Sequence, residues 1–304
     1  MSEYISGIDV GGTKTLGVLY DLKGTEIDRV TKGFSTLSVD EDKAIENIIA
    51  TIDYLFNKLE KENLILHIQL GIAGASKLRS KDKFIENIQS RYNATATLVT
   101  DAELALNSIS KNMSKNVIMV LGGTGSVVIG TNKESNNIIG GFGHLLGDEG
   151  SGYHLAISAL KEIISQYEHG VEVTNLSKMI LKEINATDHF EIKDFVYNNK
   201  KSDIAVLSLF ISEMAMKGNK EAQSLFENEG KHLARQTYSA YKKIDTNDSV
   251  IVCIRGGFLL NAPFVKDTMF EELNKLDMKY EIFEDQVEPI VGAYYMGLIE
   301  ISKR

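Results

Sequence analysis

Short apolar blocks alternate along the chain with longer segments in which apolar residues recur at helical spacing. The first two blocks, residues 4–10 and 16–20, are aliphatic and β-branched, and Gly11-Gly12 separates them. Apolar blocks bounded by glycine predict β-strands, and apolar residues three or four positions apart predict helices. The pattern that follows predicts strands at 26–31, 68–71 and 96–99 and helices at 41–59, 82–89 and 101–110.

A second series of the same kind occupies the rest of the chain. After a second glycine turn, the pattern predicts strands at 138–139, 250–254 and 279–283 and helices at 151–164, 264–276 and 289–301. Residues 172–244 are rich in Lys, Glu and Asn with apolar residues at helical spacing, which predicts a helical insertion. Both series read strand–strand–strand–helix–strand–helix–strand–helix. This order indicates an α/β protein of two duplicated lobes, each a mixed sheet flanked by helices.

The two glycine turns are copies of one another. Gly11-Gly12-Thr13 and Gly122-Gly123-Thr124 lie 111 positions apart, and apolar strand positions match on both sides. Asp9, however, stands opposite Val120, so the acid occurs in only one copy. Two lobes that each present a glycine turn indicate a cleft with the turns facing across it.

Length and composition set the limits of this interpretation. The 304 residues, 43% of them hydrophobic, are enough for two domains with buried cores. We expect an N-terminal lobe at 1–114, a C-terminal lobe at 115–288 that includes the insertion, and a final helix at 289–304 packed on the N-terminal lobe.

Charge and cysteine content exclude several classes of function. A net charge of −9 argues against a nucleic-acid or anionic-membrane surface. Cys253 is the single cysteine, which excludes an internal disulfide and any zinc or iron–sulfur site built from cysteines of one chain. No stretch approaches the ~18 apolar residues of a membrane helix, and no basic segment followed by an apolar run begins the chain. We therefore expect a cytoplasmic protein.

Two aspartates have both a structural and a chemical interpretation. Asp9 stands at a strand end before Gly11-Gly12. This position fits either an ordinary hairpin or a carboxylate that acts beside a metal-bound phosphate. Asp101 opens a helix directly after a strand. Thr100 and Glu103 have the spacing of a capping box, and Asp101 also suits a general base that accepts a proton from an attacking hydroxyl. The two interpretations of Asp101 are compatible.

The stretch "IIGGFGHLLGDEGSGYHLA" concentrates glycines around Phe142, His144, Asp148 and Glu149. Backbone that approaches a polyhydroxylated ligand, with carboxylates accepting from its hydroxyls and an aromatic ring beneath, explains this composition better than a structural loop. In "CIRGGFLLNAPF" the Gly-Gly pair between strand and helix fits either a common connection or a nucleotide contact.

Taken together, these motifs resemble the sugar-kinase branch of the actin–hexokinase–Hsp70 ATPase superfamily, whose lobes are ribonuclease H-like. The resemblance is strongest to the N-acetylglucosamine kinase and dehydratase-activating ATPase family. It runs from Gly7 to Gly297 and is carried by "GIDVGGTKT", "TDAELAL", "LGGTGS" and "GGFGHLLGDEGSG". It implies that ATP, Mg²⁺ and a sugar bind in the interlobe cleft.

The resemblance also implies a role for each motif residue. Asp9 would hold Mg²⁺ through water, and Asp101 would be the catalytic base. The first turn would bind the β- and γ-phosphates, the second turn the remaining phosphates, and the Gly-Gly pair adenosine; these residues are Gly11, Gly12, Thr13 and Lys14, then Gly123, Thr124 and Gly125, then Gly256 and Gly257. The sugar pocket would be lined by Asp101, Gly141, Phe142, Gly143 and Asp148.

The resemblance implies an ATP-dependent kinase that phosphorylates the primary hydroxyl of an amino sugar, such as N-acetylglucosamine, N-acetylmuramic acid or glucosamine. Two positions depart from the family pattern on the sugar side: Leu37 replaces an Asn, and Phe142 replaces the usual Trp. Two alternatives remain, an ATPase activator of a 2-hydroxyacyl-CoA dehydratase and a non-catalytic sugar sensor. The small-molecule sugar is the expected partner, and a homodimer is left open.

Overall fold

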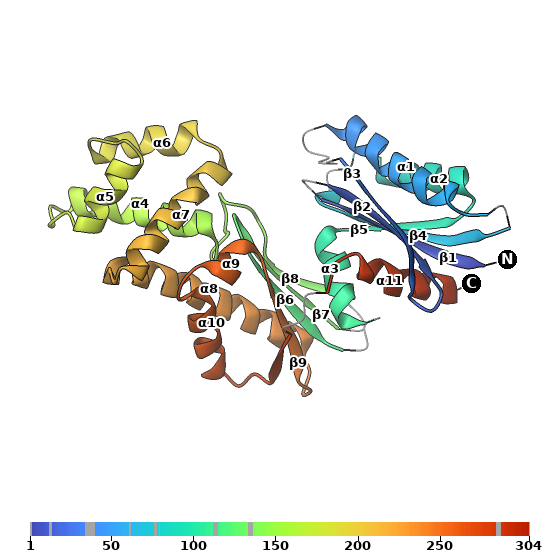
Figure 1. Cartoon of the computed structure of the whole chain (residues 1–304). Coiled ribbons are helices and arrows are strands. Elements are labelled where there is room, and N and C mark those ends of the chain that lie inside the picture. Colours follow the sequence, from blue (N-terminus) through green and yellow to red (C-terminus); the bar gives the residue numbers. More distant parts are fainter. Residues whose placement is uncertain are drawn as a thin grey trace. The chain divides into compact units, whose positions relative to one another are not determined.

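The computed structural model (Figure 1) describes residues 2–11, 14–33, 40–60, 62–75, 78, 80–111, 115–132, 136–283 and 287–303. The chain divides into two compact units: the first unit is Met1–Lys115 with Asp285–Arg304, and the second unit is Asn116–Glu284. Within the described residues, no helix has the length and apolar character that crossing a membrane requires.

The first unit is a five-stranded mixed sheet with helices on both faces. Its strand order is β3-β2-β1-β4-β5, with antiparallel pairs among β1, β2 and β3 and parallel pairs among β1, β4 and β5. The strands are β1 (Glu3–Val10), β2 (Thr15–Asp21), β3 (Glu26–Lys32), β4 (Leu64–Ile72) and β5 (Thr95–Val99). The helices are α1 (Glu41–Asn57), α2 (Lys81–Tyr92), α3 (Asp101–Ser110) and α11 (Val291–Ser302).

Alternation along β2 explains why this sheet is covered twice. Leu19 packs in the core beneath α1 and α2, whereas Leu16 and Val18 pack with Leu104 of α3 and Ala293 of α11. Successive strand side chains point to opposite faces, so a strand that is apolar at nearly every position must be buried on both. Figure 1 shows α1 and α2 on one side of this sheet and α3 and α11 on the other.

The second unit repeats this topology. Its strand order is β10-β9-β6-β7-β8, again antiparallel among the first three strands in sequence and parallel through the rest. The strands are β6 (Val117–Gly122), β7 (Ser126–Thr131), β8 (Asn136–Gly140), β9 (Val250–Arg255) and β10 (Tyr280–Phe283). The prediction of two duplicated mixed sheets flanked by helices is confirmed.

The helices of the second unit differ from the expected arrangement. They are α4 (Gly152–Glu168), α5 (Asn175–Glu183), α6 (Ile192–Asn198), α7 (Lys201–Met216), α8 (Lys220–Ile244), α9 (Gly257–Asn261) and α10 (Val265–Asn274), with a 3₁₀ turn at His189–Glu191. The helix that packs on β6, β7 and β8, as α1 packs on β1, β2 and β3, is α8. The order of elements predicted from the sequence assigns the helix at 151–164 to that place, whereas α4 packs mainly on α7. Both helices are amphipathic, and periodicity does not say which partner an apolar face meets.

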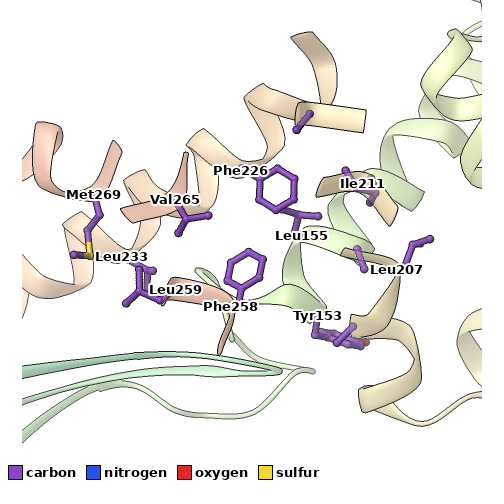
Figure 2. Packing of buried hydrophobic residues seen from close by; sticks show 14 of the residues in the cluster. Tyr153, Leu155, Leu207, Ile211, Phe226, Leu233, Phe258, Leu259, Val265 and Met269 are labelled. Atoms are coloured by element: carbon purple, nitrogen blue, oxygen red, sulfur yellow. The ribbon is translucent and has the colours of Figure 1, made fainter. Parts of the chain in front are cut away.

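One continuous core joins the inserted helices to those that cover the sheet. Figure 2 shows Phe226 of α8 and Phe258 of α9 close to Leu155 of α4 and to Leu207 and Ile211 of α7. The rings of Phe226 and Phe258 are stacked with their centroids 6.0 Å apart. Because these side chains are shared, α4 and α7 are held firmly beside the sheet of the second unit.

Candidate active site

Asp9 and Asp101 lie at the same edge of the first unit's sheet. Asp9 is the second-last residue of β1, and Asp101 follows the end of β5. Because β1, β4 and β5 are parallel, their carboxyl ends lie at one edge of the sheet. Burial, and next the charge of Asp101, raise the pKa of Asp9 to about 6, while Lys14 opposes the rise. A carboxyl group whose ionisation is opposed by burial and by a neighbouring carboxylate indicates a negative potential at this edge.

The helix cap beside Asp101 is made by other residues. Thr100 Oγ1 accepts a hydrogen bond of 3.1 Å from the Glu103 N–H, and Glu103 Oε2 accepts one of 2.9 Å from the Thr100 N–H. The predicted capping box is confirmed. The Asp101 carboxylate takes no part in this reciprocal pair and is exposed at the start of α3. It is therefore available for chemistry without cost to the cap.

Part of the first glycine turn can be described. The Gly11 N–H donates to the Lys14 carbonyl at 3.0 Å, the Lys14 side chain is exposed, and Val10 pairs with Thr15 across the turn. Gly12, Thr13 and Leu37 lie outside the described residues. The phosphate role of this turn stays a prediction.

Asp9 and Asp101 are two carboxylates at one sheet edge, which bears on the kind of metal that could bind there. Among the residues that the structure describes, no cluster of three or more His, Cys, Asp or Glu could hold a metal ion. Mg²⁺ commonly binds through one or two carboxylates together with water and substrate phosphates. The role of Asp9 toward Mg²⁺ stays a prediction.

The second glycine turn is clamped by the loop before α4. The Gly123 N–H donates to the Gly125 carbonyl at 2.8 Å, and the Gly123 carbonyl accepts from the Gly152 N–H at 3.0 Å. Ser126 Oγ donates to the Glu149 carbonyl at 2.7 Å. The turn and the glycine-rich loop that the sequence singled out separately are therefore one assembly.

A buried carboxylate of α8 holds this loop from behind. Glu229, 1% exposed, accepts from the Gly150 N–H at 2.6 Å and from His154 Nδ1 at 2.8 Å. The hydrogen bond to Glu229 raises the pKa of His154, against the effect of burial. Gly150 has φ +92°, and a Cβ there would meet Leu233. Glu229 is not predictable from local sequence, because no local pattern links an α8 residue to a loop 79 positions away.

The predicted sugar-pocket residues divide into an exposed and a buried group. Gly141, Phe142 and Gly143 are in the open part of the loop, with Phe142 75% exposed. Asp148 is 3% exposed and has φ +69°. Its carboxylate accepts from the Ser126 N–H at 3.3 Å and from Lys201 Nζ at 2.5 Å. Asp148 thus supports the second turn, and its role toward a sugar stays a prediction.

A cavity of about 450 Å³ opens beside the second turn. Gly123 and Thr124 line one part of it, and Gly257 another. Gly256 approaches the Gly122 backbone so closely that a Cβ would lie 2.4 Å from the Gly122 oxygen, and its φ is +97°. A further part of the wall comes from the insertion, which carries no recognised motif: Ser202, Val206, Leu209 and Ser212 of α7. The available signal in the sequence was that α7 is apolar around most of its circumference, so that Val206 and Leu209 stay exposed while Leu207 and Ile211 are buried.

The sequence profile of the BadF/BadG/BcrA/BcrD ATPase family matches residues 6–297, which is nearly the whole chain. The protein belongs to this family. The match spans both units and every motif discussed above, and it confirms the resemblance inferred from the sequence. A family of ATPases also agrees with ATP as the nucleotide expected here.

Several proteins similar to this chain are named as sugar kinases. The chain is 28% identical over 309 residues to the N-acetylmuramic acid/N-acetylglucosamine kinase of Clostridium acetobutylicum, covering 98% of this chain and 99% of that one. It is 27% identical to the N-acetyl-D-glucosamine kinase of Dictyostelium discoideum, covering 97% and 98%. The fold is similar to that of a candidate N-acetylglucosamine kinase from Chromobacterium violaceum, with a TM-score of 0.67 at 21% identity, covering 97% and 98% of the two chains.

Proposed function

We propose that this member of the family is an ATP-dependent sugar kinase that phosphorylates the primary hydroxyl of an N-acetylglucosamine-like amino sugar. The observation that carries the proposal is Asp101, an exposed carboxylate at the carboxyl end of β5 that is spared from the helix cap and lies near a second acid, Asp9. The kinases named above, which match this chain over nearly its full length, support the amino sugar as the substrate class.

The proposal gives the residues of the first unit the charge chemistry. Asp101 accepts the proton of the sugar hydroxyl as its oxygen attacks the γ-phosphorus of ATP, and ADP leaves with the bridging oxygen. Asp9 would hold Mg²⁺, which would neutralise phosphate charge. Gly11, Gly12, Thr13 and Lys14 contact the β- and γ-phosphates.

The residues of the second unit bind the rest of the nucleotide and the sugar. The cavity beside Gly123 and Thr124 takes adenosine, with Gly257 at its wall, and the Gly123–Gly125 turn contacts phosphate. Backbone amides in a glycine turn bind phosphate without a side chain in the way. The open Gly141–Phe142–Gly143 segment meets the sugar, for which an exposed aromatic ring provides an apolar surface.

The two alternatives have less support. An activator that holds an iron–sulfur cluster between subunits needs two cysteine ligands from each, and Cys253, the one cysteine, is buried within β9. A sugar sensor has no need of Asp9 and Asp101 together at one sheet edge.

The test is ADP release with Mg²⁺ and ATP, measured separately with N-acetylglucosamine, N-acetylmuramic acid, glucosamine and glucose. We expect sugar-dependent turnover and a higher kcat/KM for at least one amino sugar than for glucose. Phosphorylation at the primary hydroxyl is checked on the product by NMR.

The outcomes separate the candidate functions. ADP release that no sugar stimulates favours the activator, and sugar binding without turnover favours the sensor. If glucose exceeds all three amino sugars, the chain is a sugar kinase of another specificity.

A further inference from the structure

Lys201, the first residue of α7, projects onto the second glycine turn. Its Nζ lies 2.5 Å from Asp148 Oδ2, and a Cβ built on Gly125 would be 2.5 Å from the same nitrogen. The ammonium group is therefore in contact with the turn itself. The next residue, Ser202, lines the cavity that Gly123 and Thr124 also line.

The two partners of this ion pair differ in burial. The Asp148 side chain is 4% exposed and the Lys201 side chain 30%. Asp148 also accepts from the Ser126 N–H, so its position is fixed by the strand that follows the turn. An ammonium group has three N–H donors, and Asp148 is the one acceptor that the described residues give to Lys201. The cation is held at the mouth of the turn with donor capacity remaining.

We propose that Lys201 is a nucleotide-phosphate ligand, which Asp148 holds in position and which contacts the β-phosphate at the Gly123–Gly125 turn. The β-phosphate is then shared with the first turn, and the α-phosphate is left to the backbone amides of the second turn. This inference rests on the proposed use of a nucleoside triphosphate. It adds a charged side chain to a turn that otherwise offers only backbone amides and the Thr124 hydroxyl.

The second turn needs such a cation for an electrostatic reason. Asp148 lies within 3.0 Å of the position of a Cβ on Gly125, so a polyphosphate at this turn would meet a nearby carboxylate. Like charges in a partly buried site repel strongly. Lys201 neutralises Asp148 and presents its remaining donors to the phosphates, which turns a repulsive position into an attractive one.

The test is calorimetric titration of AMP, ADP and ATP into the full chain and into three variants at one salt concentration. Lys201→Met removes the ammonium group and keeps much of the length of the side chain. Lys200→Met, at the exposed neighbouring position, is the matched control. Lys201→Met/Asp148→Asn removes both charges.

We expect Lys201→Met to weaken ADP and ATP binding about 10- to 100-fold, the range for a hydrogen bond to a charged group, and AMP binding by less than about threefold. Lys200→Met should bind all three as the parent does. The double variant should regain part of the lost affinity, because the repulsion from Asp148 is gone. Thermal unfolding of each variant shows whether the fold is kept.

Three results overturn the inference. An equal loss for AMP and ADP means that Lys201 shapes the adenosine cavity, and unchanged ADP binding means that it only balances Asp148. A Lys201→Met chain that unfolds is replaced by Lys201→Gln, to which the same two criteria apply. A parent chain that binds none of the nucleotides overturns the proposed function as well. That failure is seen in the parent itself, whereas the first two results are seen only in the variants.

Discussion

The two sheets share one topology but carry different chemistry at corresponding turns. In the first unit Asp9 stands near the end of β1, with its pKa raised by burial and by Asp101. At the matching place in β6, Val120 is fully buried in the core with α8 and α10. The duplicated fold thus supplies two glycine turns, of which one has an acid beside it and the other is anchored in an apolar core.

The turns also differ in their length and in how they are fastened. Four residues separate the paired Val10 and Thr15, whereas three separate Gly122 and Ser126. The matching hydroxyls make equivalent hydrogen bonds. Thr15 Oγ1 donates to the Gly33 carbonyl, and Ser126 Oγ donates to the Glu149 carbonyl. Each ties its turn to the segment after the third strand. The two turns therefore share the hydroxyl contact to the segment after the third strand, and they differ in the charged residues beside them.

The comparison teaches that duplication and function are separate properties of this chain. A glycine turn between two antiparallel strands is present twice, since the fold is duplicated. Charged groups are distributed unequally: the first unit has two carboxylates at its edge, and the second has the Lys201–Asp148 pair at its turn.

The largest expected effect comes from removing the proposed base of the first unit. Asp101→Asn should lower kcat by about 10²- to 10⁴-fold, because the amide keeps the shape but cannot accept the hydroxyl proton. Nucleotide binding and unfolding should hardly change, since Thr100 and Glu103 make the cap. Steady-state kinetics with thermal unfolding checks both.

Thr100→Ala is the control for Asp101. It removes a cap and should cost about 1 kcal/mol of stability, with a much smaller loss of kcat. Asp101→Asn with near-normal kcat would reduce Asp101 to a helix-end residue and leave the first unit without a base.

The acid that distinguishes the two turns gives the next largest effect. Asp9→Asn should lower kcat about 10- to 100-fold, as for loss of one charged hydrogen-bonding group, and raise the Mg²⁺ concentration needed for half-maximal rate. Val120→Ala, at the matching place, should cost about 2 kcal/mol of stability and leave the Mg²⁺ requirement unchanged. A Mg²⁺ titration of the rate that is the same for Asp9→Asn and the parent would make the two turns equivalent.

Local sequence patterns were enough to predict the two sheets. They did not predict the contacts between residues that are far apart in the sequence. Strand alternation, the two Gly-Gly turns and the Thr100–Glu103 spacing are each contained in a few neighbouring residues. The partners of the glycine loop are not: Lys201 meets Asp148 across 53 positions and Glu229 meets Gly150 across 79. The exchange of α4 for α8 on the second sheet has the same origin, because both helices are amphipathic and only packing distinguishes them.

The smallest effect concerns the stability of the first unit without Mg²⁺. The pKa of Asp9 is about 6 in the folded chain, above its ordinary value of 3.8, so ionising Asp9 costs more when folded than when unfolded. The penalty is absent below the unfolded pKa, grows as pH rises through the window between the two values, and is complete above the folded one. Asp9→Asn removes this penalty.

In EDTA, urea unfolding should show Asp9→Asn more stable than the parent by about 1–2 kcal/mol near pH 8, with solvent screening of this partly exposed group included. Near pH 4 the difference should vanish. Val120→Ala should be destabilised equally at both pH values, because no charge is involved. A difference in stability between Asp9→Asn and the parent that is constant with pH, or that favours the parent near pH 8, would mean that folding does not raise the pKa of the Asp9 carboxyl.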